Sequence, residues 1–297
     1  MAAASGLVRA GGRLFVIADD RHELAVFAEA GEEPGRPRRM MAGDLPADPA
    51  ARKRAKPDFE ALALLPEGRA RGAGIGPGAG AGPGQGGGAL LALGSGSRDT
   101  RRHGVRWRLG EDGGLAGDPE PVDLAPLYGE LARAIPDLNV EGAVVSGGRL
   151  LLFQRGNGRA AVNAVIALDL RRALEDLYGG ALGPEAIAAI RRHDLGEVGG
   201  VRLAFSDAAA LPGGRVVYSA VAEAGDDTFH DGHCAGAGIG VIEPDGALGR
   251  FAQLEPAAKV EGVEASPGGE AIDLLMVADA DDPGRPSPLL AARLYPH

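Results

Sequence analysis

Hydrophobic and polar positions follow one pattern that is repeated five times along the chain. In the central copy, residues 141–170 (EGAVVSGGRLLLFQRGNGRAAVNAVIALDL), an apolar strand, a Gly-Gly turn, a second apolar strand, a polar loop and a third strand succeed one another. Gly-Gly supplies the positive φ angles of a tight strand reversal, so each copy predicts an antiparallel hairpin followed by a third strand. The copies begin at Ser5, Glu60, Glu141, Asp207 and Glu261.

Repetition of a three- to four-stranded antiparallel unit is typical of a β-propeller. The second strands are expected at 14–18, 89–93, 150–153, 216–221 and 272–278, and the third at 23–27, 104–109, 162–170, 238–242 and 288–294. We therefore predict an all-β, five-bladed propeller as a single domain over residues 1–297. A sixth, degenerate blade would have to lie within 112–136 or 171–203. The sequence does not indicate how the ring closes.

Three segments interrupt the repeats. Residues 71–88 combine glycine with little side-chain mass and no apolar periodicity, which predicts a flexible Gly-rich insertion. Residues 171–192 contain LRRALEDLY and PEAIAAIRR, with Pro184 suited to a first helical turn, and predict a helical insertion. A short helix is also expected near 128–135.

Composition narrows the classes of partner. The net charge of −10 and the scattered arginines argue against nucleic acid, because a nucleic-acid binder needs a basic face. Cys234 is the single cysteine, so the chain forms no internal disulfide. No apolar run approaches the roughly 20 residues that span a bilayer, and the first residues do not resemble a signal peptide. We therefore expect a cytoplasmic protein without a membrane partner.

Candidate site residues gather at one end of the predicted channel. In a propeller the start of the innermost strand and the end of its antiparallel neighbour meet at the same mouth. Each acid that opens a copy should lie there, with Ser5 in its place in the first copy. The predicted ligand-binding residues are Glu60, Glu141, Asp207 and Glu261 at strand starts, and Arg155, Asn157, Glu223 and Asp279 at strand ends.

Two interpretations of this acidic ring remain open. In the first, each acid is a structural group that caps backbone N–H groups of the next blade or pairs with an arginine such as Arg155. Alternatively Glu60, Glu141, Asp207 and Glu261 hold Ca²⁺ or another hard cation, since carboxylates are the ligands that such ions take. Lys56 and Lys259, which precede two of the acids, could balance the charge in either case.

Two polar segments add further candidates. Asn139, Asn157 and Asn163 are the only asparagines of the chain, and beside Arg155 they could orient a polar or anionic ligand, although asparagine is also common in turns. The segment 230–234 (HDGHC) suggests metal ligands, but the sequence offers no further ligands to complete a zinc site. We predict a surface loop there, with a lid over the channel mouth as the alternative.

The segments KPDFEALALL, LNVEGAVVSGGRLLLFQRGNG, FSDAAALPGGRVVYSAVAE and KVEGVEA resemble an uncharacterised bacterial β-propeller family near the esterase-like phytases. The resemblance covers nearly the whole chain and implies the propeller fold. Relatives of the phytase type would imply calcium-assisted phosphomonoester hydrolysis.

Three functions are therefore considered. The first is a module that binds a small molecule or a divalent cation at the acidic mouth. The second is a metal-dependent hydrolase of ester, lactone or phosphoester bonds, with Glu141 or Asp207 as the base. The third is a scaffold for protein partners.

Overall fold

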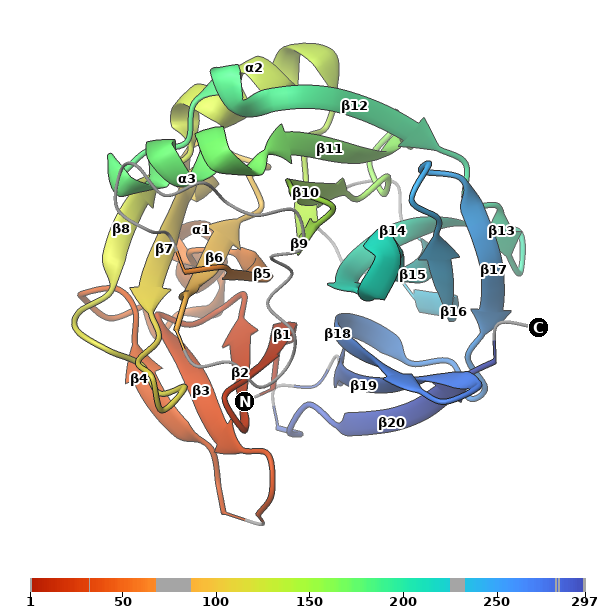
Figure 1. The fold of residues 1–297 in the computed structure, drawn as a ribbon, viewed down its shortest axis with the longest axis horizontal. Coiled ribbons are helices and arrows are strands. Elements are labelled where there is room, and N and C mark those ends of the chain that lie inside the picture. Colours follow the sequence, from red (N-terminus) through yellow and green to blue (C-terminus); the bar gives the residue numbers. More distant parts are fainter. Residues whose placement is uncertain are drawn as a thin grey trace.

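A computed structural model describes residues 2–31, 33–67, 87–224, 233–280, 282 and 284–295, without the side chain of His233. Five antiparallel sheets stand radially around a central axis, so the fold is a five-bladed β-propeller, as predicted (Figure 1). Each sheet consists of consecutive strands of the chain, and blade order follows sequence order. The described residues contain no sixth blade.

The strands of each blade run outward from the centre in chain order, as the hairpin turns require. The innermost strands are β1 (Ala4–Ala10), β5 (Phe59–Leu65), β9 (Val140–Ser146), β14 (Val201–Ala210) and β18 (Lys259–Gly268). The second strands are β2 (Arg13–Ala18), β6 (Ala89–Gly94), β10 (Arg149–Gln154), β15 (Val216–Ala224) and β19 (Ala271–Asp279). The third strands are β3 (Glu23–Ala28), β7 (His103–Arg108), β11 (Asn163–Asp169), β16 (His233–Ile242) and β20 (Leu289–Leu294).

The outermost layer differs between blades. Four blades carry a fourth strand, whereas the described part of the fifth blade ends with β20. The fourth strands are β4 (Arg36–Arg39), β8 (Glu120–Asp123), β12 (Ile187–His193) and β17 (Leu248–Gln253), and the two-residue β13 (Glu197–Val198) pairs with the first residues of β14.

In the described part of the chain, three α-helices lie on the blades. They are α1 (Pro49–Ala55), α2 (Ala125–Ala134) and α3 (Leu170–Tyr178), with short 3₁₀ turns at Asp99–Arg101, Pro184–Ala186 and Pro212–Gly214. The prediction of a helical insertion over 171–192 is wrong in its second half, because Ile187–His193 forms β12 and pairs with β11. Of the Gly-rich segment 71–88, residues 71–86 lie outside the described part of the chain. None of the described helices is long and apolar enough to cross a bilayer.

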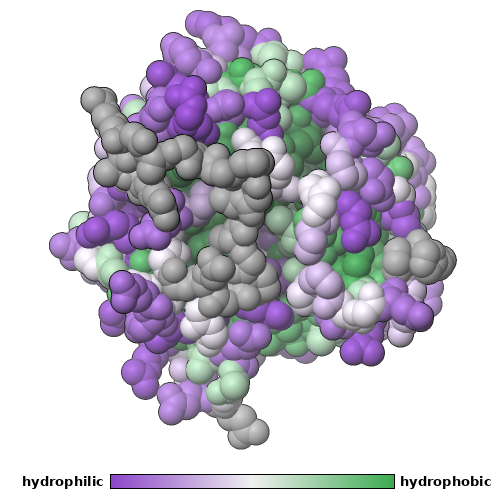
Figure 2. Space-filling view, viewed as in Figure 1, coloured by the Kyte–Doolittle hydropathy of each residue, from purple (hydrophilic) through white to green (hydrophobic). Residues whose placement is uncertain are grey.

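Side-by-side packing of the first and last blades closes the ring. β1 lies against β18, and Leu7 and Val16 of blade one share an apolar cluster with Val277 of blade five. The backbone N–H of Arg9 also donates to Glu264 Oε1 at 2.7 Å. Hydrophilic residues dominate the rim of the face seen in Figure 2, while hydrophobic residues show between the blades.

Candidate functional site

The candidate site is a cavity of about 80 Å³ where the innermost strands begin, called here the charged mouth. Twelve of its described lining residues are ionisable. Seven are carboxylates and five are cations, so the cavity is not a ring of bare acids. They are Asp19, Asp58, Glu60, Glu141, Glu223, Glu261 and Asp279, with Lys53, Lys56, Arg101, Arg155 and Lys259.

β-Bulges in four of the five innermost strands place a side chain in the lining of this mouth, and the fifth bulge, at Ser206, does not. In each innermost strand one residue is skipped by the pairing with the second strand, and such a bulge bends the strand and redirects the side chain. The position after it is small where blades approach closely, since a Cβ on Gly262 would lie 2.9 Å from the Leu7 nitrogen. The skipped residues are Ser5, Glu60, Glu141, Ser206 and Glu261.

The placement of Asp207 in the acidic ring is wrong. Ser206 occupies the bulge, and Asp207 follows it at the position that Gly142 and Gly262 hold in neighbouring blades. Its Oδ2 accepts from the backbone N–H of Val263 at 2.8 Å, which ties blade four to blade five. Asp207 is not among the described residues that line the charged mouth. The structural interpretation of the acids therefore holds for this residue.

Arg155, which follows β10, gathers acids from three blades. Its Nη1 lies 3.0 Å from Glu141 Oε2, and its Nη2 lies 2.6 Å from Glu223 Oε2. Glu261 Oε1 is 3.7 Å from Nη1. Lys259 adds a second cation 3.2 Å from Glu223 Oε1. These side chains are at most 8% exposed, so blades three, four and five meet in a buried ionic network.

Burial and charge oppose each other in this network. Burial raises the pKa of Glu261 to about 8, while Arg155 acts in the opposite direction. Burial likewise raises the pKa of Glu141, again against Arg155. The pKa of Arg155 lies above its usual value because Glu141, Glu261 and Glu223 outweigh its burial. The arginine thus stays charged, while burial makes Glu141 and Glu261 easier to protonate than an exposed glutamate.

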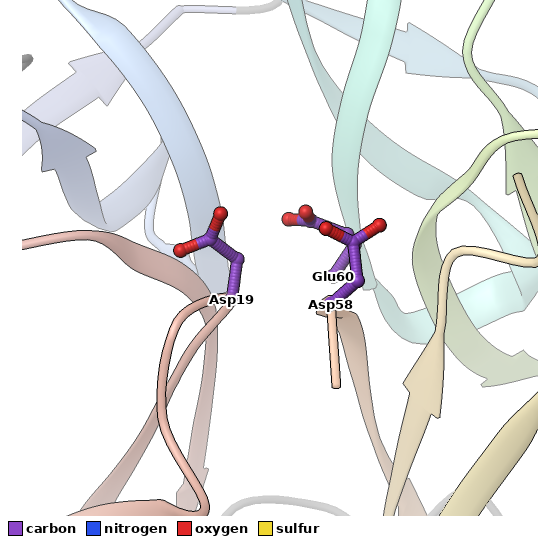
Figure 3. A group of neighbouring side chains, drawn as sticks. All are labelled: Asp19, Asp58 and Glu60. Atoms are coloured by element: carbon purple, nitrogen blue, oxygen red, sulfur yellow. The ribbon is translucent and has the colours of Figure 1, made fainter. Parts of the chain in front are cut away.

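A second cluster joins blades one and two. Asp19 follows β2, Asp58 precedes β5, and Glu60 lies within β5; one carboxylate oxygen from each lies within 4.8 Å of the others. Figure 3 shows Asp19 across a gap from Asp58 and Glu60. The Lys56 ammonium pairs with Asp19 and lies 2.9 Å from Asp58 Oδ1. Arg101 Nη1 lies 2.8 Å from Asp58 Oδ2.

Glu60 differs from the other carboxylates of the mouth. Among the described residues, each of the other six has an ion pair within 4 Å, whereas Glu60 makes no hydrogen bond or ion pair. Its half-buried side chain lines the cavity. Burial, followed by the negative charges of Glu141 and Asp58, raises the pKa of Glu60 well above its usual value. The cavity therefore presents one carboxyl whose acceptors are available to a ligand.

The asparagines divide between the cavity and the core. Asn139 and Asn157 line the charged mouth, and Asn139 Nδ2 donates to Glu141 Oε1 at 2.6 Å. Asn163 instead accepts from Gly156 N at 2.9 Å and donates to the carbonyl of Leu203 at 2.8 Å, so it joins two blades.

Sequence reasoning named several of the residues that line the cavity and missed others, and their role in ligand binding stays a prediction. Glu60, Glu141, Arg155, Asn157, Glu223, Glu261 and Asp279 all line the cavity. Asp58, Arg101 and Lys53 were not predicted. Asp19 could have been found, because it directly follows a second strand, close to the position that Asp279 holds at the end of β19. The segment 230–232 lies outside the described residues, so its prediction as a surface loop or lid stays a prediction.

Comparison with known proteins identifies a family and several structures of similar fold. The family of unknown function DUF6929 matches over residues 1–294. A search of curated proteins found no match. Among solved structures, a luciferin-regenerating enzyme is similar at 10% identity and a TM-score of 0.43, over 99% of this chain and 91% of its own. The β-propeller domain of Myceliophteria thermophila Cps50 (Swd1) is similar at 12% identity and a TM-score of 0.39, over 98% of each chain.

AztD from Citrobacter koseri is similar at 9% identity and a TM-score of 0.29, over 98% of this chain and 74% of its own. Likenesses of this size carry no argument about activity. The expected proximity to phytases stays a prediction.

Proposed function

We propose that the chain, which belongs to the family of unknown function DUF6929, binds a small cation at the charged mouth. One observation carries the proposal: Glu60 lines the cavity and, among the described residues, lacks a hydrogen bond or ion pair. An unpaired carboxyl in a partly buried cavity costs free energy, which a bound cation recovers. A divalent metal ion and an organic ammonium share this chemistry.

The spacing of the acids suits a metal ion. Calcium takes oxygen ligands at about 2.3–2.6 Å, so oxygens on opposite sides of one ion lie about 5 Å apart. The oxygens of Asp19, Asp58 and Glu60 lie within 4.8 Å of one another. The Lys56 ammonium is already paired with two of these acids, so a bound ion competes with this side chain.

A thermal-shift panel tests the proposal and identifies the cation. Protein freed of metal by a chelator is heated with Ca²⁺, Mg²⁺, Mn²⁺ or methylammonium. A ligand that binds only the folded state raises the unfolding free energy by about 2.7 kcal/mol at one hundred times its dissociation constant. We expect stabilisation by at least one cation and its loss in Glu60→Gln, but not in Glu130→Gln, an exposed carboxylate on α2. No stabilisation by any of the four would contradict the proposal.

The alternatives have less support. Glu141, one proposed base of a hydrolase, is held by Arg155 and Asn139, and Asp207, the other, ties two blades together. No contact of the described residues favours a protein scaffold over a ligand-binding role. A cytoplasmic location stays a prediction from the sequence.

A further inference from the structure

A second cavity lies at the other end of the innermost strands, called here the alanine mouth. It measures about 100 Å³ and takes its described lining from β1, β5, β9, β14 and β18. Six of its fourteen described lining residues are alanines, and six more are leucine or valine. Small side chains leave the space, and aliphatic walls make it favourable for an apolar group.

The remaining two lining residues supply the polar chemistry. They are Arg9 and Glu264. Glu264 Oε1 accepts from the backbone N–H of Arg9 at 2.7 Å. The Arg9 guanidinium turns instead to Glu29, with Nε 3.5 Å from Glu29 Oε1. Among the described residues Glu264 therefore has no ion-pair partner within 4 Å, although it is the only carboxyl in the lining.

We infer that the alanine mouth is a binding site for a short aliphatic amine. The aliphatic walls would surround the alkyl chain, and the Glu264 carboxylate would accept from the ammonium. Cavities of about 150 Å³ lined by aliphatic and aromatic residues bind benzene, so this space suits a chain of a few carbons. The site shares no lining residue with the charged mouth, and the inference does not rest on the proposed function.

The protonation state of Glu264 should control the affinity of the site for the amine. Burial raises the pKa of Glu264 to about 7, against the lowering effect of the Arg9 N–H and charge, and Glu29 adds to the rise. Asp207 lies near enough for its charge to interact with that of Glu264. An alkylammonium stays protonated at pH 8.5, as lysine does. Its affinity should therefore rise between pH 6 and pH 8.5 as Glu264 ionises.

Three probes of equal chain length separate the amine from other ligands. Binding of n-butylammonium, 1-butanol and butyrate would be followed by NMR titration at pH 8.5, with the amides of Ala143, Ala209 and Ala265 as reporters. A charge-assisted hydrogen bond is stronger than a neutral one, so we expect butylammonium to bind about tenfold more tightly than butanol. Butyrate should bind less tightly than either probe, because its charge repels Glu264.

Substitutions test whether the preference for butylammonium over butanol arises at the alanine mouth. Glu264→Gln should reduce the affinity for butylammonium to that for butanol, while Glu130→Gln should leave it unchanged. Ala210→Phe, at an exposed lining position, should block both probes and also covers the case in which Glu264→Gln fails to fold. Equal affinities for ammonium and alcohol, an unchanged preference in Glu264→Gln, or no shift of the three amides would each overturn the inference.

Discussion

The two mouths lie at opposite ends of the innermost strands and differ in almost every physical respect. The starts of the strands carry bulges that direct acids into a cavity with twelve ionisable lining residues. The ends carry alanines around a single carboxyl, Glu264. Bulges contribute three of the twelve ionisable residues, Glu60, Glu141 and Glu261, and other segments contribute the remaining nine. Ionic pairing holds one mouth together, and aliphatic packing forms the other.

Of the substitutions considered, removal of the Arg155 guanidinium from the charged mouth should lower the free energy of unfolding most. Arg155→Met leaves Glu141 and Glu223 buried without their guanidinium partner, and breaking a buried ion pair costs about 3–5 kcal/mol. We expect a loss of this size in chemical denaturation. Arg149→Met, which removes a half-exposed pair with Asp169, should cost less than about 1 kcal/mol. Equal losses in the two variants would show that the network does not stabilise the ring.

The carboxyl of Glu264 at the alanine mouth should make the stability of the protein depend on pH. The pKa of Glu264 is about 7 in the folded protein, above the unfolded value, so folding takes up a proton and stability falls as pH rises from about 4.5 to 7. Glu264→Gln removes this loss. We expect similar stabilities of the two proteins at pH 4.5 and a gain on the order of 2–3 kcal/mol for the variant at pH 8.5. Parallel pH profiles would contradict the assignment.

The Asp207→Ala variant tests whether Asp207 only joins two blades or also takes part in cation binding. Asp207→Ala leaves the buried N–H of Val263 without its acceptor, which costs about 1–3 kcal/mol. Cation binding at the charged mouth should not change in this variant, because Asp207 does not line that cavity in the described structure. Chemical denaturation measures the loss of stability, and the thermal shift with added cation measures cation binding. If the variant lost the stabilisation by the cation but kept its stability without the cation, Asp207 would have to be counted among the cation-binding residues.

Lys56 should compete with the cation that it resembles. Its ammonium pairs with Asp19 and Asp58, so Lys56→Met exposes their charge to an added ion. We expect a rise of about tenfold in the affinity for the divalent cation, equivalent to about 1.4 kcal/mol. Arg54→Met, at an exposed position of α1 two residues before Lys56, is the matched control. An unchanged affinity would place the ion away from Asp19 and Asp58.

Much of the fold could be predicted because the Gly-Gly turns and apolar strands repeat in a local pattern. The error at Asp207 arose from loop length: β9 and β10 are joined by Gly147-Gly148, whereas Ala210 pairs with Val216 across a five-residue loop. Counting back from the glycines therefore shifts the bulge by one residue. The segment PEAIAAIRR was assigned to a helix with Pro184 in its first turn, but only Pro184–Ala186 forms a 3₁₀ turn, and the following residues pair with β11.

The site was less accessible to sequence reasoning. The acids at strand starts could be aligned, yet Asp58 and Arg101 lie outside the aligned positions and reach the cavity only through the packing of blades. Nothing in the sequence distinguishes the unpaired Glu60 from the paired Glu141, because the pairing depends on where Arg155 points.

Calorimetric titration with the cation selected by the thermal-shift panel tests the central claim most directly. For the wild-type protein the account predicts one cation bound per chain. For Glu60→Gln, which should stay folded because Glu60 makes no hydrogen bond or ion pair among the described residues, it predicts at least a tenfold loss of affinity. Unchanged affinity and stoichiometry in folded Glu60→Gln would contradict the account.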